Sequence, residues 1–594
     1  MKRWVSWLAW LAVFIAVAFF VSRSEYIWLM LWARVQSAPV QFTVIVVVAA
    51  ILLDFFAPHM GARAFGPIEK FGARLAARKR AAILAVAAAA ILIRLALLPV
   101  APVPAPEIHD EFSYLLAADT FAHGRLANPP HRLSIYFDTF HVNTHPTYVS
   151  IYPPAQGAVL ALGEILGHPW VGVLLSTALM CGAVTWMLQG WLPPQWALLG
   201  GVLVLLRLGI FSYWMNSYWG GAVAAIGGAL ALGALPRILR SWRAGDALIL
   251  GIGTAILANS RPFEGFILLV PVYVVLGARL LKSRARTPRV PVRQVLAPLC
   301  VVLILCGAFM LYYNQRTTGN ALSFPYVLNV QSRFSIPLLA WQKTRPAFHF
   351  MNPQFDAYYN VWWKSVAWPN GRPDTAKNIR LALIDNGRNF GAYFLWPELC
   401  VPLLALPWLF RDRRTRFLIV QWVICFAGFI LVAWFQPHYA APLVATTFAL
   451  IIQAVRHIRQ WRLGGRPIGA GISRAIVLCA LIFSATHTAY LNLEPSLEQR
   501  AKIAAELNAR PGDQLVIVRY FAGHNPSQEW VYNGADIDHS KVVWAREIPG
   551  VSMQPLLDYF RGRRVWLVTP DSNPAKLSPY DPRAQGNESS MSGG

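Results

Sequence analysis

Long apolar runs separated by short polar connections dominate this chain of 594 residues. A helix needs about 20 apolar residues to cross the roughly 30 Å hydrocarbon core of a bilayer. Thirteen runs approach this length and predict an all-α polytopic membrane protein. The predicted spans are residues 5–22, 39–57, 82–100, 169–190, 195–214, 218–236, 246–260, 263–281, 294–313, 391–410, 416–435, 438–456 and 473–491.

Residues 153–167 form a shorter apolar stretch, which begins with Pro153-Pro154 and ends at Gly167. The stretch is too short for a confident span and predicts a juxtamembrane or re-entrant helix. The alternative, that it crosses the membrane, stays open and would place the basic connection 237–245 on the outer side.

Composition supports the membrane assignment, because 56% of the residues are hydrophobic and only 14% are charged. Soluble domains carry about a quarter charged residues, so an ordinary cytosolic or disordered chain is excluded. A net charge of +25 could indicate nucleic acid. The basic residues instead fall in one set of short connections, which makes that set cytoplasmic. The N-terminus is then inside, the C-terminus is outside, and no nucleic-acid partner is expected.

The predicted spans and the segments between them divide the chain into four parts. Residues 1–81 hold two N-terminal spans and a cytoplasmic loop, and residues 82–491 form the membrane core. Two long exoplasmic loops, 101–153 and 314–390, interrupt this core. Beyond it, strand-like runs at 515–518, 542–544 and 565–568 alternate with helix-like segments at 498–509 and 552–562. Residues 492–578 therefore predict a small exoplasmic α/β domain, and 579–594 a disordered tail.

The first exoplasmic loop concentrates the polar chemistry, with five acids and five histidines but only two arginines. Asp110 and Glu111 stand together just after the third span. Neighbouring carboxylates repel, so one of them could have a raised pKa and act as a proton acceptor. The alternative is a solvated pair that caps the next helix.

A metal is a second use for these side chains. Asp110, Glu111 and the loop histidines could supply oxygen and nitrogen ligands to a divalent cation. No HExxH motif is present. We therefore expect no certain cofactor and keep a divalent metal as the open alternative.

The order of these motifs resembles that of membrane glycosyltransferases of the GT-C superfamily. Asp110-Glu111 opens the loop and Tyr152-Pro153-Pro154 closes it, as in the family-39 group of protein O-mannosyltransferases and lipid A aminoarabinose transferases. The resemblance covers roughly residues 82–456 and implies a GT-C fold with Asp110 as the catalytic base beside Glu111. The chain departs from the group in its two extra N-terminal spans and in its C-terminal α/β part. Tyr152 also replaces a lysine that contacts the lipid phosphate in some members.

Other polar positions lie at the predicted outer ends of spans. Arg261 and Glu264 occur in one such turn, Arg316 follows the ninth span, and His438-Tyr439 interrupts a late apolar run. The resemblance implies a donor site near His438 and Tyr439. Guanidinium groups bind phosphate oxygens well, so we predict that Arg261, Arg316 and His438 share one cavity. The alternative for the first turn is a structural Arg261–Glu264 ion pair.

The resemblance implies transfer of a hexosyl or pentosyl group from a polyprenyl-phosphate donor to an acceptor hydroxyl, by direct displacement with an Asp base. The acceptor could be a glycan, a lipid or a protein, and membrane lipids are the remaining partners. A glycan ligase or polymerase and a lipid-linked sugar transporter stay open as alternatives. The expected location is the inner membrane of a bacterium, with the C-terminus in the periplasm.

Overall fold

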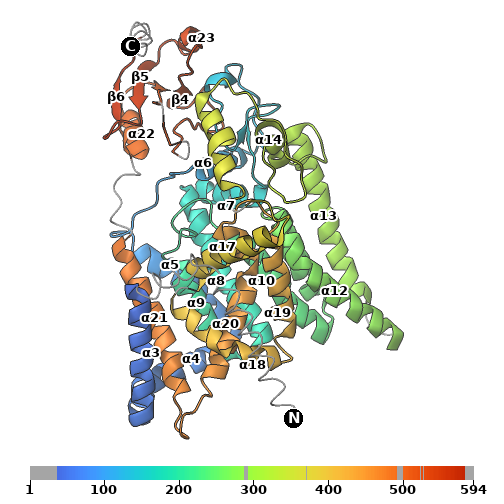
Figure 1. Ribbon diagram of the computed structural model, residues 1–594. Coiled ribbons are helices and arrows are strands. Elements are labelled where there is room, and N and C mark those ends of the chain that lie inside the picture. Colours follow the sequence, from blue (N-terminus) through green and yellow to red (C-terminus); the bar gives the residue numbers. More distant parts are fainter. Residues whose placement is uncertain are drawn as a thin grey trace.

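The computed structural model describes residues 37–286, 292–369, 371–395, 397–490, 499–521, 523–525 and 528–581. Its helices form an elongated bundle, with a small sheet and two long loops at one end (Figure 1). The predicted first span, 5–22, lies outside the described residues, as does most of the predicted tail.

Within the described residues, seven helical segments are long and apolar enough to cross a membrane, or up to eight if one bent pair counts as a span. They are α3 (Ala38–Phe56), α8 (Pro169–Trp191), α10 (Ala222–Ser241), α12 (Pro262–Arg286), α13 (Val292–Thr318), α20 (Val444–Ile458) with the preceding η5 (Pro437–Leu443), and α21 (Gly469–Tyr490). Shorter apolar helices are α9 (Pro194–Val204) with η2 (Leu205–Gly209), α11 (Ala244–Ala258) and α19 (Arg416–Phe429). The chain is a multi-pass membrane protein, but a count of thirteen spans is not confirmed.

The predicted span 391–410 is wrong as a single helix. The structure has α17 (Ala376–Phe394) followed by η4 (Glu398–Ala405) and α18 (Leu406–Arg411), with a bend of 116° between the two parts. Pro397 and Pro402 lie in this stretch and cannot donate the backbone hydrogen bonds that a continuous helix needs. The bend follows from these prolines.

The N-terminal connection is also more ordered than a loop. α4 (Pro58–Ala77) fills most of the predicted cytoplasmic loop and leads to α5 (Lys79–Ala96), which occupies most of the predicted span 82–100. Met60, Ile68 and Phe71 on α4 are exposed. Exposed apolar residues beside basic ones are typical of a helix that lies in the membrane interface.

The first exoplasmic loop contains α6 (His109–Ala122), η1 (Ser134–Tyr136), β1 (Val142–Asn143) and β2 (Val149–Ser150), and α7 (Pro154–Ile165) follows it. α7 has 12 residues and is therefore about 18 Å long, which confirms the predicted short helix. Gly163 of α7 meets Gly172 of α8 so closely that an added Cβ on Gly172 would lie 2.2 Å from the Val159 carbonyl oxygen. These glycines let α7 pack directly on α8.

The second loop packs over the same end of the bundle. It contains α14 (Pro325–Arg333), α15 (Pro353–Phe355), η3 (Asp356–Trp362) and α16 (Trp363–Val366). Phe140 of the first loop, Phe334, Phe355 and Tyr359 belong to one buried aromatic cluster. The two loops are therefore joined by a common apolar core.

The C-terminal part contains α22 (Gln499–Ala509), β3 (Gln514–Val518), β4 (Val542–Arg546), α23 (Gln554–Tyr559), β5 (Arg564–Thr569) and β6 (Lys576–Pro579). The sheet order is β4-β3-β5-β6, with β3 parallel to both of its neighbours and β6 antiparallel to β5. The three predicted strands and both predicted helices are confirmed. Strand β6 has no apolar run that would have revealed it.

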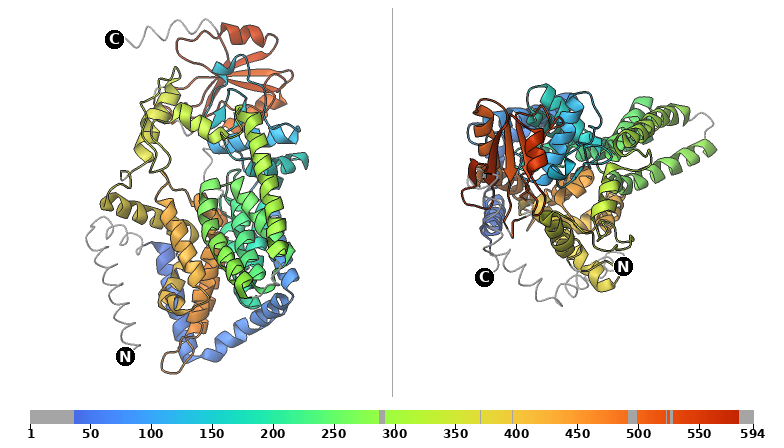
Figure 2. Two further views of the ribbon diagram at one scale, coloured as in Figure 1. Left: turned by 90° about the vertical axis from the view of Figure 1, so that its right-hand side faces the viewer. Right: turned by 90° about the horizontal axis from the view of Figure 1, so that it is seen from above.

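This sheet shares a hydrophobic core with the first loop. Phe112 and Leu116 of α6 belong to the same buried cluster as Leu515 and Ile517 of β3. The ring of Tyr532 stacks on Phe112 with centroids 4.4 Å apart. Figure 2 places the sheet beside α6 at this end of the molecule. The C-terminal part therefore supports the helix that carries Asp110.

Candidate active site

A cavity of about 770 Å³ lies where the two exoplasmic loops meet the bundle. Its walls come from the start of α6, the start of α12, the second loop and the turn at η5. Six of the eight residues predicted from the sequence line it: Asp110, Tyr152, Arg261, Glu264, His438 and Tyr439. Glu111 and Arg316 are not among the lining residues.

Glu111 fixes the start of α6. Its Oε2 accepts hydrogen bonds from the backbone N–H groups of Glu107 (2.8 Å) and Ile108 (3.2 Å), and its Oε1 accepts one from Tyr218 (2.9 Å). Burial raises the pKa of Glu111 to about 7, although these donors act in the opposite direction. The raised pKa expected for one member of the acid pair thus falls on Glu111, whose contacts position α6 against the turn at Tyr218.

Asp110 is the member of the pair that faces the cavity. The Tyr152 hydroxyl donates a hydrogen bond to its Oδ1 and lies 2.8 Å from His141 Nδ1. Burial alone would raise the pKa of Asp110, but the His141 and His109 imidazoles and the Tyr152 hydroxyl hold it well below its usual range. The carboxylate is therefore ionised at neutral pH.

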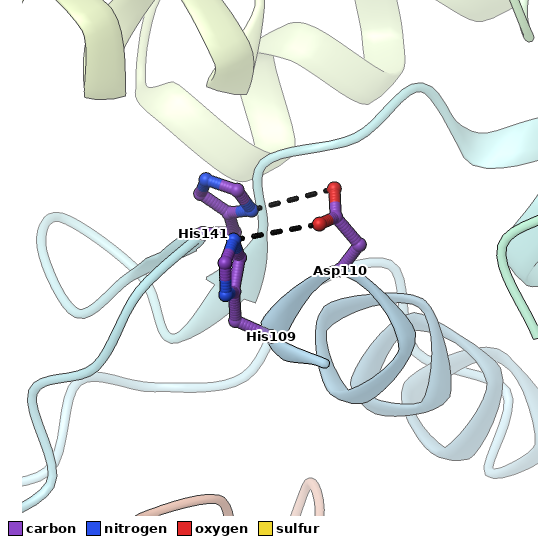
Figure 3. A group of neighbouring side chains, drawn as sticks. All are labelled: His109, Asp110 and His141. Atoms are coloured by element: carbon purple, nitrogen blue, oxygen red, sulfur yellow. Dashed lines mark ion pairs between the residues drawn. The ribbon is translucent and has the colours of Figure 1, made fainter. Parts of the chain in front are cut away.

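Two histidines flank this carboxylate (Figure 3). His141 Nδ1 lies 3.5 Å from Oδ1, and His109 Nε2 lies 3.5 Å from Oδ2. His141 comes from the far side of the loop and has a left-handed backbone, with φ of 58°. This conformation is uncommon for a residue other than glycine and concentrates at functional sites.

Arg261 supplies the cavity with a cation. Its guanidinium carbon lies 4.7 Å from the centre of the Tyr439 ring. The Tyr439 ring is the side-chain contact found for this guanidinium among the described residues, where it has no ion pair within 4.0 Å and no side-chain hydrogen bond. No direct Arg261–Glu264 ion pair forms within 4.0 Å among the described residues, but the buried Glu264 carboxylate still attracts the guanidinium. The N–H groups of the guanidinium are available to an anion in the cavity.

His438 and Glu264 are both buried in the cavity wall. Nδ1 of His438 lies 2.9 Å from the Tyr213 hydroxyl, and its ring packs edge-on against Trp219 with centroids 4.7 Å apart. The imidazole is thus held in one orientation toward the cavity. Glu264 lies in the first turn of α12, where the helix dipole stabilises a carboxylate.

Arg316 does not join this cluster. Met310, Tyr313 and Asn314 of α13 line the cavity, with the spacing of one helix face. Arg316 lies two positions beyond Asn314, roughly 200° around the helix, and is exposed. The prediction that Arg316 shares a cavity with Arg261 and His438 is therefore wrong, because the position after a span does not determine the helix face.

The structure singles out two of the loop histidines and adds a tyrosine to the predicted site residues. His109 and His141 belong to the histidine-rich loop, and this enrichment was the signal for them. Tyr358 comes from the second loop, and its hydroxyl lies 3.3 Å from both His109 Nε2 and His141 Nε2. No motif marks Tyr358, because only the packing of one loop on the other brings it here.

The solved structures similar to this chain include two proteins, one of them in two states. ArnT from Cupriavidus metallidurans bound to undecaprenyl phosphate has 12% sequence identity and a TM-score of 0.46, over 82% of this chain and 92% of that chain. Its apo state has 14% identity and a TM-score of 0.45, with the same coverage. An Archaeoglobus fulgidus oligosaccharyltransferase tethered with an acceptor peptide has 12% identity and a TM-score of 0.37, over 74% and 62% of the two chains.

All three matched structures are less than 15% identical to the chain and have TM-scores below 0.5. No protein-family model and no curated protein matches the chain. At this level of similarity we base the function on the residues of the cavity itself.

Proposed function

We propose that this protein is a membrane glycosyltransferase that moves a sugar from a polyprenyl-phosphate donor to an acceptor hydroxyl. One observation carries the proposal: the Asp110 carboxylate and the unpaired Arg261 guanidinium line the same cavity of about 770 Å³. A group-transfer reaction with a phosphate leaving group needs both a proton acceptor and a cation for the phosphate.

Arg261 is assigned to the donor phosphate. A guanidinium can bind two phosphate oxygens at once, and the aromatic ring of Tyr439 holds this one in place. Phe263, Phe334 and Trp434 also line the cavity, so its walls suit the apolar chain that follows the phosphate.

Asp110 is assigned to the acceptor. As the acceptor oxygen bonds to the anomeric carbon, its proton passes to the carboxylate. The bond from the anomeric carbon to the phosphate oxygen breaks, and the polyprenyl phosphate leaves with the electron pair. A single displacement inverts the anomeric configuration and requires no second catalytic carboxylate. His438 and Tyr439 would form the donor side of the cavity, and the Tyr152 hydroxyl would hold Asp110.

This function places the cavity at the exoplasmic face. We propose a bacterial inner membrane, with the N-terminus in the cytoplasm and the C-terminus in the periplasm. The charge distribution of the connections supports this orientation. The acceptor is a glycan, a lipid or a protein hydroxyl.

The experiment incubates the purified full chain, in lipid nanodiscs, with synthetic polyprenyl monophosphate sugars and envelope acceptors. We expect release of polyprenyl monophosphate coupled to a sugar-bearing product with the inverted linkage. Consumption of only a diphosphate-linked oligosaccharide would show a ligase, and movement of an intact donor across a sealed vesicle would show a transporter. Either outcome would overturn the proposal.

A matched pair of arginine variants tests the donor site. Arg261→Gln should lower donor affinity by about 10- to 150-fold, because a hydrogen bond to a charged group contributes about 1.5–3 kcal/mol. Arg316→Ala removes an exposed cation outside the cavity and should change donor affinity less than about two-fold. Equal losses in both variants would contradict the assignment of the phosphate to Arg261.

A further inference from the structure

Three side chains at the cavity wall are spaced as ligands of one cation. His109, Asp110 and His141 each offer a nitrogen or carboxylate oxygen, and these atoms all lie within 4.8 Å of one another. All three residues line the cavity, so a cation between them would be open to a bound substrate. Figure 3 shows both imidazoles facing the carboxylate from the same side.

The distances suit a shared cation better than direct bonds between the side chains. Each histidine nitrogen lies 3.5 Å from a carboxylate oxygen, which is longer than a regular N–H···O hydrogen bond. In a tetrahedral zinc site with bonds of about 2.0–2.1 Å, neighbouring ligand atoms stand about 3.4 Å apart. The two 3.5 Å separations end on different oxygens of the Asp110 carboxylate, and each is close to the spacing between neighbouring ligands of a zinc ion.

The surroundings also resemble those of metal-binding histidines. The second ring nitrogen of a metal-binding histidine usually bonds to a further polar group, which fixes the tautomer. His141 Nδ1 faces Asp110, while its Nε2 lies 3.3 Å from the Tyr358 hydroxyl. The left-handed backbone of His141, which is sterically unfavourable, turns this ring toward Asp110.

We propose that His109, Asp110 and His141 bind one divalent transition-metal ion of the zinc class, with an open coordination position toward the cavity. Two imidazole nitrogens and a carboxylate favour such an ion over Mg²⁺, which prefers an all-oxygen set. Three protein ligands with an open fourth position are typical of catalytic zinc sites. Such an ion supplies a Lewis acid for an oxygen of the acceptor or of the donor phosphate.

Two tyrosine hydroxyls lie near the nitrogens assigned to the metal: Tyr358, 3.3 Å from His109 Nε2, and the closer Tyr152. The Tyr152 hydroxyl lies 2.8 Å from His141 Nδ1, the nitrogen assigned to the metal. On metal binding, Nδ1 exchanges this hydrogen bond for the metal, while the hydroxyl keeps its bond to Asp110 Oδ1. Tyr152→Phe should therefore leave zinc stoichiometry unchanged.

Metal content is the direct test, and it needs no turnover. Bound metal is first removed from the full chain with a chelator. The chain is then incubated with ZnCl₂ or MgCl₂ and desalted, and its metal content is measured by inductively coupled plasma mass spectrometry. We expect one zinc ion per chain and no retained magnesium. His109→Ala and His141→Ala should each weaken zinc binding by at least about 100-fold, because even second-sphere changes cost 10- to 100-fold.

The chain offers a matched control in a second cluster, made of Asp119, His123 and Glu164. His123 in this cluster is exposed, and its Nδ1 lies 2.9 Å from Asp119. His123→Ala should keep the zinc. Loss of zinc in His123→Ala alone would move the ion to this cluster and overturn the proposal, as would a wild-type chain that retains no zinc.

A third variant separates ligand loss from misfolding. His141→Cys replaces the imidazole with a thiolate that can still bind the ion. With Co²⁺ it should acquire a thiolate-to-cobalt charge-transfer band that the wild type lacks, and absence of this band in a folded variant contradicts the proposal. The metal site shares its cavity with the proposed sugar transfer, but zinc can bind in a chain that transfers no sugar, so either proposal can fail alone.

Discussion

Replacing Asp110 with asparagine removes the negative charge of the side chain but keeps its size and shape. The amide oxygen of the new side chain can still accept the hydrogen bond from the Tyr152 hydroxyl that Oδ1 accepts now. The variant should therefore fold normally. Loss of a general base typically lowers the rate by about 10²–10⁴. This corresponds to about 2.7–5.4 kcal/mol in the activation free energy.

The neighbouring substitution, Glu111→Gln, should act in the opposite way. Oε2 accepts two backbone N–H bonds and Oε1 accepts a third, and a glutamine side chain keeps only one acceptor oxygen. At least one buried backbone N–H then loses its partner, which costs about 1–3 kcal/mol of folding stability. We expect a lower Tm for Glu111→Gln and a smaller loss of turnover than for Asp110→Asn.

Both variants are compared by turnover of a polyprenyl-phosphate sugar at matched membrane expression, together with thermal unfolding. Near-wild-type turnover for Asp110→Asn with an inactive but stable Glu111→Gln would exchange the two roles. Near-wild-type turnover for both would leave the cavity without a proton acceptor and refute the assignment.

Three further substitutions probe the support of the site. Tyr152→Phe removes the hydroxyl that bonds to Asp110 and should lower kcat about ten-fold, measured with a saturating donor. Tyr532→Ala removes the ring that stacks on Phe112 and should cost about 3–5 kcal/mol, measured as a loss of thermal stability in the full chain. Gly172→Ala places a Cβ 2.2 Å from the Val159 carbonyl oxygen and should cost about 1–3 kcal/mol. Wild-type unfolding temperatures for the last two would contradict the packing described.

The local parts of the fold could be predicted from the sequence, because each depends on a contiguous run of residues. The apolar run 39–57 became α3, and the strand-like runs of the C-terminal part became β3, β4 and β5. Asp110 could be located by its position after a span. Hydropathy does not reveal the bend near Pro397, because the run stays apolar across the prolines that interrupt the helix.

The rest of the site depends on contacts between distant segments. His141 reaches Asp110 because its backbone is left-handed, a conformation that the residue types in this segment do not predict. Tyr358 arrives from the second loop, and the exclusion of Arg316 depends on which face of α13 meets the cavity. A sequence pattern gives the side of the membrane on which a residue lies, but it does not give the neighbours that fold against it.

The core shared by α6 and the C-terminal sheet affects how the protein folds during its synthesis. Asp119 of α6 accepts a hydrogen bond from the Ala535 backbone N–H, 416 positions further along the chain. The ribosome makes the chain starting from its N-terminus, so α6 lacks this partner until nearly the whole chain has been made. The acidic helix gains its full packing only after the last strands have been made and have reached the same side of the membrane. A chain that ends just before the C-terminal sheet would carry every residue that lines the cavity, but it would lack the sheet that packs on α6.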